Sequence, residues 1–313
     1  MFARAARALR DPGSSTIDAR RASLGILAAF LAPALLIYAG FTIYPVIRTF
    51  YNAFFTIKPQ GVVDFVGFGN FTALLFADLT FWKAVSNTAL FTIVATIVDV
   101  VGGLLLALCL FAQAPLARFF RVVWFTPVLM SYVIVGILWV WIFDYDWGLA
   151  NATLRWVGLG GLEQSWLGHP STALWSVLVA HEWKWLGFNM IVFLAALHAL
   201  PGEVLGAAEL DNCGWFAKLV YVIAPMLRAT IVNLLVLSFI GKMMVFDLVW
   251  VMTGGGPLWS SETVSTYVYK RAFEWNTFDL GYPSAIAVLW FVIILAFVAM
   301  MTRWLRRRDK LEF

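Results

Sequence analysis

The sequence predicts an all-α integral membrane protein that crosses the bilayer six times. Of its 313 residues, 62% are hydrophobic and 13% are charged, which leaves too little polar surface to cover a water-soluble protein of this length. Six apolar runs come near the roughly 20 residues that a helix needs to cross a bilayer. Backbone amides must be paired inside lipid, and the weak ten-residue alternation of a membrane β-barrel is absent, so these runs are expected to be helices.

The expected spans lie within a membrane domain at residues 24–303, between tails at 1–23 and 304–313. They cover about residues 24–46, 85–111, 122–143, 172–197, 229–251 and 284–302. The first run is too long for the apolar part of a signal peptide, and no clear cleavage site follows it, so we expect an uncleaved span. The fourth and fifth spans are separated by a polar interval at 198–223.

The basic residues predict the orientation of the chain. Six spans place both termini on one side, which then carries 14 Lys and Arg residues against 6 on the other side, with Lys184 and Lys242 left inside spans. The positive-inside rule puts both termini, and with them the interval 198–223, in the cytoplasm. These flanks account for the net charge of +4, and no basic groove with interleaved aromatic residues indicates a nucleic acid partner.

The cytoplasmic interval has the character of a short amphipathic helix. Residues 207–210 favour helix formation, and Pro201 and Gly214 mark its two sides. The sequence therefore predicts a short surface helix between the fourth and fifth spans.

No catalytic or metal centre is predicted. The chain lacks a GxxxxGK[ST] phosphate loop, a GxSxG elbow and an HExxH motif. Its three histidines are too scattered to indicate a metal site, and Cys109 and Cys213 lie on the reducing side, where a structural disulfide is not expected. The chain is therefore not expected to be an enzyme, and uphill transport would take its energy from a partner or an ion gradient.

The cytoplasmic interval also carries a motif. Gly206-Ala207-Ala208 is followed by Glu209-Leu210-Asp211, then Asn212, nine residues, and Val222-Ile223-Ala224-Pro225. This resembles the Glu-Ala-Ala motif of ATP-binding-cassette (ABC) importer permeases, with both alanines, the proline and the spacing intact. Asp211 stands where the sugar branch usually has Asp, whereas Gly206 replaces the leading glutamate and Asn212 replaces the glycine.

Five further segments extend the resemblance over the whole chain. They are Pro33-Ala34 with Tyr44-Pro45, Gly67-Phe68-Gly69-Asn70-Phe71, Phe81-Trp82-Lys83-Ala84-Val85-Ser86-Asn87-Thr88, Thr253-Gly254-Gly255-Gly256-Pro257, and Leu280-Gly281-Tyr282-Pro283-Ser284-Ala285. In this order they are similar to the permease subunits of bacterial ABC importers for carbohydrates, of the maltose/glycerol-phosphate type.

The resemblance implies a type I ABC importer permease fold in the bacterial inner membrane, working by alternating access. It also implies a second related permease, two ATPase subunits that bind ATP and Mg, an extracytoplasmic solute-binding protein and a sugar cargo, with no cofactor in this chain. The residues expected to couple to the ATPase are Glu203, Gly206, Ala207, Ala208, Glu209, Asp211, Asn212 and Pro225. Glu203 and Glu209 each lie three residues from Gly206, and one of them is expected to replace the missing glutamate.

Ionisable residues within the spans indicate where cargo could pass, since such residues usually face the interior of a bundle or a wet cavity. Glu182, Trp185 and Asn189 recur at i, i+3 and i+7 and share one helix face, where an acceptor, an indole and an amide suit a sugar. An internal pair of Glu182 with Lys184 or Lys242 is an equally open interpretation. The candidates for the substrate pathway are Glu182, Trp185, Asn189, Asn233, Lys242 and Asp99.

The outer loop 252–283 contains a glycine-rich turn, Gly254, Gly255, Gly256 and Pro257. Glycine tolerates unusual backbone angles, and we expect this turn to contact the binding protein. Three alternatives stay open: an ABC permease for glycerol phosphate or a polyol, an ion-coupled secondary transporter, which would need inverted repeats that we do not find, and a membrane enzyme.

Overall fold

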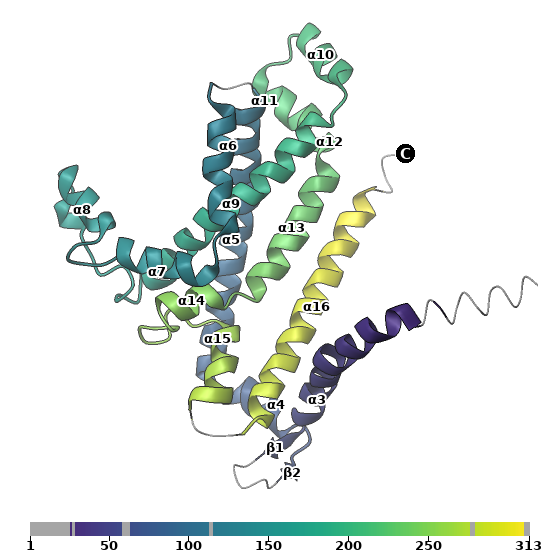
Figure 1. The fold of residues 1–313 in the computed structure, drawn as a ribbon, viewed down its shortest axis with the longest axis vertical. Helices are drawn as coiled ribbons and strands as arrows, with labels where there is room; N and C mark the ends of the chain where they lie inside the picture. Colours follow the sequence, from purple (N-terminus) through teal and green to yellow (C-terminus); the bar gives the residue numbers. More distant parts are fainter. Residues whose placement is uncertain (1–25, 27–28, 58–62, 113–114, 276–278, 310–313) are drawn as a thin grey trace, which may run out of the picture.

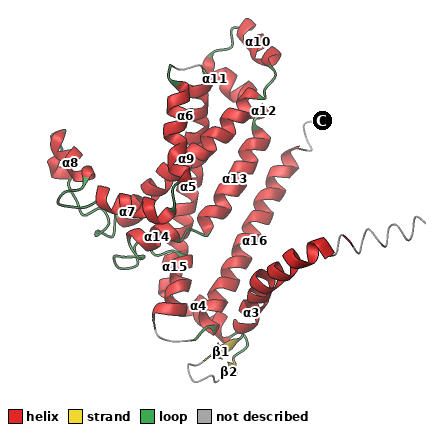
Figure 2. Cartoon of the chain, viewed as in Figure 1, coloured by secondary structure: helices red, strands yellow, loops and turns green. Residues whose placement is uncertain are grey.

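The computed structural model describes residues 26, 29–57, 63–112, 115–275 and 279–309, and side chains as far as Arg303. Within these residues the chain is almost entirely helical (Figure 2). The described strands, β1 (Phe55–Ile57) and β2 (Val63–Phe65), form one antiparallel pair. The expected tail at 1–23 lies outside the described residues, and the tail at 304–313 is described only as the continuation of the last helix to Asp309.

The centre of the molecule is a helical bundle (Figure 1). Helix α5 (Leu79–Phe111) packs along α9 (Ala173–His198) and also against α13 (Arg228–Met243), and α13 contacts α16 (Gly281–Asp309). Apolar clusters fill the contacts between α5 and α9 and between α5 and α16. A Cβ on Gly103 would lie only 2.6 Å from the Cβ of Asn189, so glycine permits the close approach of α5 and α9.

The N-terminal helix stands apart from this bundle. It runs from Ala29 to Asn52 and includes the π-turn η1 (Ala39–Ile43) and α3 (Tyr44–Asn52), which packs against α16. None of its most apolar 18-residue window is buried within the chain. An apolar surface of this length is typical of contact with lipid or with another subunit.

Six candidate spans are found when bent helices are counted as single spans. Three described helices are long and apolar enough alone: Ala29–Asn52, Leu79–Phe111 and Gly281–Arg303. Three further helix pairs pass together but bend between their halves: Ala117–Leu129 with Tyr132–Ile142 by 106°, Ala173–His198 with Gly202–Leu210 by 79°, and Trp215–Met226 with Arg228–Met243 by 74°. The number agrees with the six spans expected, although the pairs at 173–210 and 215–243 have other bounds than the runs expected at 172–197 and 229–251.

The third and fifth runs differ from the straight helices that the sequence suggested. At 122–143, α6 (Ala117–Phe125) passes into the 3-10 turn η2 (Thr126–Leu129), and α7 (Tyr132–Ile142) leaves at a new angle. Pro127 within η2 lacks an amide hydrogen, and the Ser131 hydroxyl accepts from the Ile134 amide at 3.3 Å to start α7. At 229–251, α13 ends at Met243 and the short α14 (Asp247–Met252) follows and packs against α7.

Short elements at the two ends of the bundle complete the chain. One end carries β1, β2, α4 (Gly69–Phe76), α15 (Val264–Tyr269) and the π-turn η5 (Lys270–Glu274). The other end carries α10 (Gly202–Leu210), α11 (Trp215–Lys218), η4 (Leu219–Ile223) and α12 (Ala224–Met226). Between α7 and α9, α8 (Leu149–Trp156) and the 3-10 turn η3 (Gly160–Leu162) project to the side (Figure 1).

Candidate functional site

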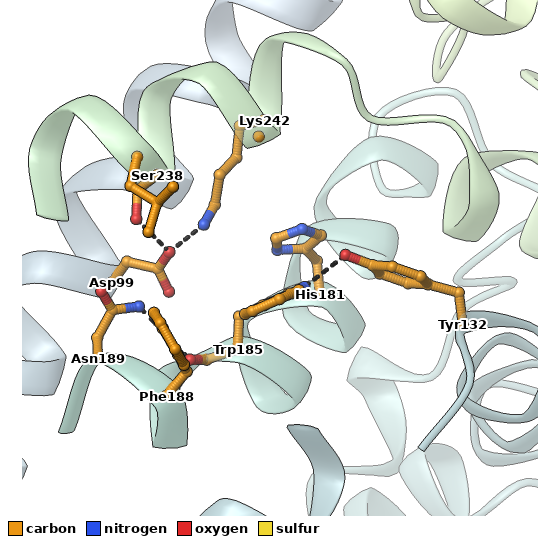
Figure 3. Close-up of a pocket in the computed structure, with 10 residues that line it drawn as sticks. Asp99, Tyr132, His181, Trp185, Phe188, Asn189, Ser238 and Lys242 are labelled. Carbon is orange, nitrogen blue, oxygen red and sulfur yellow. Dashed lines mark hydrogen bonds and ion pairs between the residues drawn. The ribbon is translucent and has the colours of Figure 1, made fainter. Parts of the chain in front are cut away.

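A cavity with both apolar and charged side chains on its lining lies among the central helices. Its volume is about 280 Å³, near the lower end of the range of roughly 300 Å³ and above that is usual for small-molecule sites. Side chains from α5, α7, α9 and α13 surround it (Figure 3). The lining residues are Asp99, Tyr132, His181, Trp185, Phe188, Asn189, Leu237, Ser238, Gly241 and Lys242.

An ion pair between two spans forms one wall of this cavity. The Lys242 ammonium on α13 contacts Oδ2 of Asp99 on α5, and the Ser238 hydroxyl donates to the same oxygen at 3.0 Å. All three residues are buried. Figure 3 shows the other carboxylate oxygen turned away from Lys242, and this Oδ1 has no hydrogen-bond donor among the described residues. An ion pair between helices is the usual way to accommodate charge in a membrane.

The predicted face of α9 contributes two of its three residues to the lining. The Trp185 indole donates to the Tyr132 hydroxyl at 2.6 Å, which fixes the ring beside the start of α7. Asn189 is buried, and its side-chain oxygen has no donor among the described residues. The Phe188 ring meets that of Trp185 edge to face at 5.7 Å. This face therefore presents an aromatic surface and an acceptor to the cavity.

Glu182 lies behind the lining rather than on it. Its Oε1 is 3.1 Å from Nδ1 of His181, and its carboxyl neighbours that of Asp99. Lys184 is not its partner, because the Lys184 ammonium donates to backbone carbonyls instead. Asn233 is exposed on α13 and is not among the residues that line this cavity.

The interval 198–223 forms the short helix that its composition indicates. Helix α10 projects beyond the bundle (Figure 1), and its last residue, Leu210, is 86% exposed. Glu209 Oε1 binds the Lys218 ammonium at 2.7 Å, and this hydrogen bond and charge lower the pKa of Glu209. Glu203 is exposed and has no ion-pair partner among the described residues. Ala208 is buried, whereas Ala207 faces outward.

The two positions that depart from the motif differ in their surroundings. Asn212 follows α10 with φ of +52°, a left-handed conformation that glycine adopts freely and asparagine tolerates better than most other residues. No atom lies within 4 Å of the position that a Cβ on Gly206 would take. At position 212 asparagine thus takes a conformation that suits glycine, and at position 206 there is room for a larger side chain.

The glycine-rich turn is folded back against the protein. Gly254 and Gly255 have φ of +57° and +83°, and the Glu262 carboxylate occupies the place that a Cβ on Gly255 would need. Glu262 in turn binds the Lys270 ammonium at 2.5 Å. Burial raises the pKa of Glu262, and Lys270 opposes this shift. Leu258, which follows Pro257, is 83% exposed at the tip of this turn.

Sequence reasoning missed several groups at these sites. Ser238 lies four residues before Lys242, and this spacing could have indicated that the two side chains share one helix face. Gly241 directly precedes Lys242 and carries no such signal. Tyr132 had no such signal, because its position depends on the break between η2 and α7. The Glu262–Lys270 pair likewise depends on the fold of the loop.

The chain matches a known family over most of its length. Residues 99–310 match the family described as the binding-protein-dependent transport system inner membrane component, and the chain belongs to this family. It is a multi-pass permease of the ABC transporter class.

Individual relatives and structures agree with this class. The chain is 32% identical to the probable ABC transporter permease protein YurN of Bacillus subtilis, over 88% of this chain and 94% of that protein. It is 31% identical to the sulfoquinovosyl glycerol transport system permease protein SmoG of Agrobacterium fabrum, over 89% and 90%. It is 30% identical to the trehalose/maltose transport system permease protein MalF of Thermococcus litoralis, over 95% and 98%.

The fold is similar to that of a chain in a bacterial alginate ABC transporter, solved with an alginate pentasaccharide-bound periplasmic protein. The TM-score is 0.80, at 24% identity, over 94% of this chain and 97% of that chain.

Proposed function

We propose that this chain is one permease half of an ATP-driven, binding-protein-dependent sugar importer, with both termini in the cytoplasm. The observation that carries the proposal is helix α10, which projects from the bundle as an exposed helix within a motif that the family shares. Relatives named for trehalose/maltose, lactose and arabinooligosaccharides support a sugar as cargo.

In this proposal the ATP and Mg are bound by two partner ATPases, and α10 transmits their movement to the spans. Glu203 is the acidic side chain that remains available to a basic residue of the ATPase, because Glu209 is held by Lys218. A second, related permease contributes the other half of the pathway. It would cover part of the apolar surface that this chain leaves exposed.

The cavity between α5, α9 and α13 is the proposed sugar contact in this half. Trp185 and Phe188 offer the aromatic faces on which the C–H side of a sugar stacks, and Asn189 offers a buried acceptor. The turn at Gly254–Pro257, with Leu258 exposed at its tip, is the proposed contact for the solute-binding protein, and its loop lies beside α14, away from α10 (Figure 1).

The test begins with purification of the tagged chain, expressed together with the ATPase, second permease and binding protein of its own organism. We expect a stable complex whose ATP turnover in proteoliposomes rises with binding protein and a sugar from a panel that includes maltose, trehalose and lactose. Uptake of the sugar without ATP, or purification of a chain that retains no ATPase, would contradict the proposal. The Trp185→Ala and Asn189→Ala variants should assemble but transport more slowly, and unchanged transport would exclude this face as the sugar contact.

A further inference from the structure

The two lysines around the cavity are both committed to other groups. Lys242 is held by Asp99. Lys184 donates to the carbonyls of Pro127, Val128 and Met130 at 3.3, 3.0 and 2.6 Å. An ammonium has three hydrogens, so these carbonyls use its full donor capacity. Lys184 therefore keeps no free donor, the charge of Lys242 is offset by that of Asp99, and no arginine is among the described residues that line the cavity.

The buried polar atoms that lack a partner at the lining are acceptors. Among the described residues they are Oδ1 of Asn189 and Oδ1 of Asp99, on residues that are 1% and 0% exposed, and the Asp99 carboxyl also lies within hydrogen-bonding reach of Glu182. The Tyr132 hydroxyl accepts from Trp185, so its own hydrogen can be donated without any charge. Behind Asp99 lies a second carboxyl, that of Glu182. The cavity thus combines free acceptors with an uncharged donor.

We propose that this cavity selects uncharged saccharides over acidic ones. The inference rests on the proposed function and specifies the class of sugar. A neutral sugar donates its hydroxyls to Asp99 and Asn189, which gives the unpartnered buried oxygens their missing hydrogen bonds. A uronate brings a carboxylate next to Asp99, whose charge already offsets that of Lys242, and an additional negative charge without its own counter-charge is strongly unfavourable at a desolvated site.

Side chains, rather than the fold, carry this selectivity. A chain of similar fold, with a TM-score of 0.79, belongs to an ABC transporter involved in the import of the acidic polysaccharide alginate. The permease fold therefore does not by itself exclude acidic cargo. In the present chain the Asp99–Lys242 pair sets the charge of the cavity, because it neutralises the one cation on the lining.

The experiment measures sugar binding to the purified complex in detergent, without binding protein, by saturation-transfer NMR and titration. The probes are maltose, trehalose and lactose, each paired with the derivative whose non-reducing C6 alcohol is oxidised to a carboxylate. We expect at least one neutral sugar to bind about tenfold or more tightly than its acidic derivative. Omitting the binding protein ensures that the preference is measured on the permeases and not on the protein that delivers the sugar.

Asp99→Asn is the variant that tests the role of the ion pair. It removes the carboxylate and frees Lys242, so binding of the acidic derivative should rise until the preference is lost or reversed. The double variant Asp99→Asn/Lys242→Met is the matched control, because it removes both charges together. It should lose affinity for the neutral sugar without gaining affinity for the acidic one. The double variant also keeps the test valid if Asp99→Asn alone fails to assemble, since it leaves no unpaired lysine.

Each result separates this inference from the proposed function. Equal binding of neutral and acidic sugars to the unaltered complex would overturn the inference, as would an acidic preference that appears equally in the double variant. A complex that imports one of the three sugars but shows no binding to any of them would also overturn it. A complex that imports none of the panel with ATP and binding protein would instead argue against sugar import itself.

Discussion

At the scale of single residues, two glutamates on α10 that look equivalent in the sequence differ in the structure. Both lie three residues from Gly206, where the family motif has its glutamate. Glu209 is bound by Lys218 at 2.7 Å, whereas Glu203 is exposed without an ion-pair partner among the described residues. The pKa of Glu209 is lowered by Lys218, so this pair is fully formed at neutral pH. Only Glu203 is therefore free to bind a partner.

We expect Glu203→Ala to lower sugar-stimulated ATP turnover by about tenfold, the effect of losing one charge-assisted hydrogen bond. Glu209→Ala should lower it less, because that side chain is already paired within the loop. The measurement is ATP hydrolysis by the reconstituted complex, with assembly checked by co-purification. Full coupling in the double Glu203→Ala/Glu209→Ala variant would exclude both residues from the ATPase contact.

Asp78 joins three helices at the opposite end of the bundle. It caps α5 by accepting from the Phe81 amide at 3.0 Å, and it accepts from the hydroxyls of Tyr267 at 2.5 Å and Tyr282 at 2.6 Å. Burial raises the pKa of Asp78, but these hydrogen bonds and Arg271 outweigh it, so the pKa lies below its ordinary 3.8. The carboxylate thus holds α5 to α15 and α16.

Replacing Asp78 by Asn should cost about 1–2 kcal/mol of stability, as for the loss of a helix cap with its hydrogen bonds. A lowered pKa means that the contribution of Asp78 is complete above the unfolded value of 3.8 and is lost only as the pH falls through the lower folded value. Thermal unfolding in detergent should therefore show the same difference between variant and parent at about pH 5 and pH 8. A difference that disappears within that range would contradict the assignment.

At the scale of secondary structure elements, two spans break near the cavity, and side chains pair the backbone groups that are freed. Lys184 donates to the three carbonyls at the η2 break. At the end of α13, the Trp290 indole donates to the Met243 carbonyl at 2.9 Å and the Thr263 hydroxyl donates to the Val245 carbonyl at 3.1 Å. Irregular backbone at membrane depth requires such partners. The breaks are therefore built features of the fold.

We expect Lys184→Met to destabilise the protein by about 3 kcal/mol or more, because it leaves several buried carbonyls without a donor. Lys184→Arg should restore part of the loss, since it keeps donors and charge. Lys83→Met, at an exposed position on α5, is the matched control and should change little. The measurement is the unfolding temperature of each of the three variants in detergent, compared with that of the unaltered protein. An equal decrease for Lys184→Met and Lys83→Met would refute the role of Lys184.

At the scale of the whole molecule, the two proposed contact surfaces lie well apart, with α10 at one end of the bundle and the loop of the glycine-rich turn beside α14 (Figure 1). Helix α10 lies at one end, near the described end of α16, and the β1–β2 pair lies at the other (Figure 1). The cavity lies between the ends, where α5, α9 and α13 meet. Such an arrangement suits alternating access, because a movement at α10 can reach the cavity through α9 and α13. The cytoplasmic position of the termini stays a prediction.

An epitope inserted after Leu258 should abolish binding-protein-dependent uptake while the complex still assembles in the membrane. Leu258 is 83% exposed at the tip of its loop, so the insertion leaves the Glu262–Lys270 pair below it in place. Uptake of labelled sugar and immunodetection of the membrane complex give the two readouts. An insertion of the same length near Trp156, the last residue of α8, whose side chain is 87% exposed, is the control. Normal uptake after insertion at Leu258 would exclude this loop as the binding-protein contact.

The sequence by itself determined the membrane environment, the six apolar runs, the helix at 202–210 and the family. Each of these follows from local composition, hydrophobic periodicity or a sequence motif, and all three can be read from residues that are neighbours in the sequence. Only the tertiary structure decided that Asp99 meets Lys242 across 143 positions of sequence, that Lys184 closes a helix break, and that Glu209 is already paired. Helical periodicity shows which residues share one face of a helix, but it does not show which other helix packs against that face. The charge of the cavity depends on which helix faces pack together.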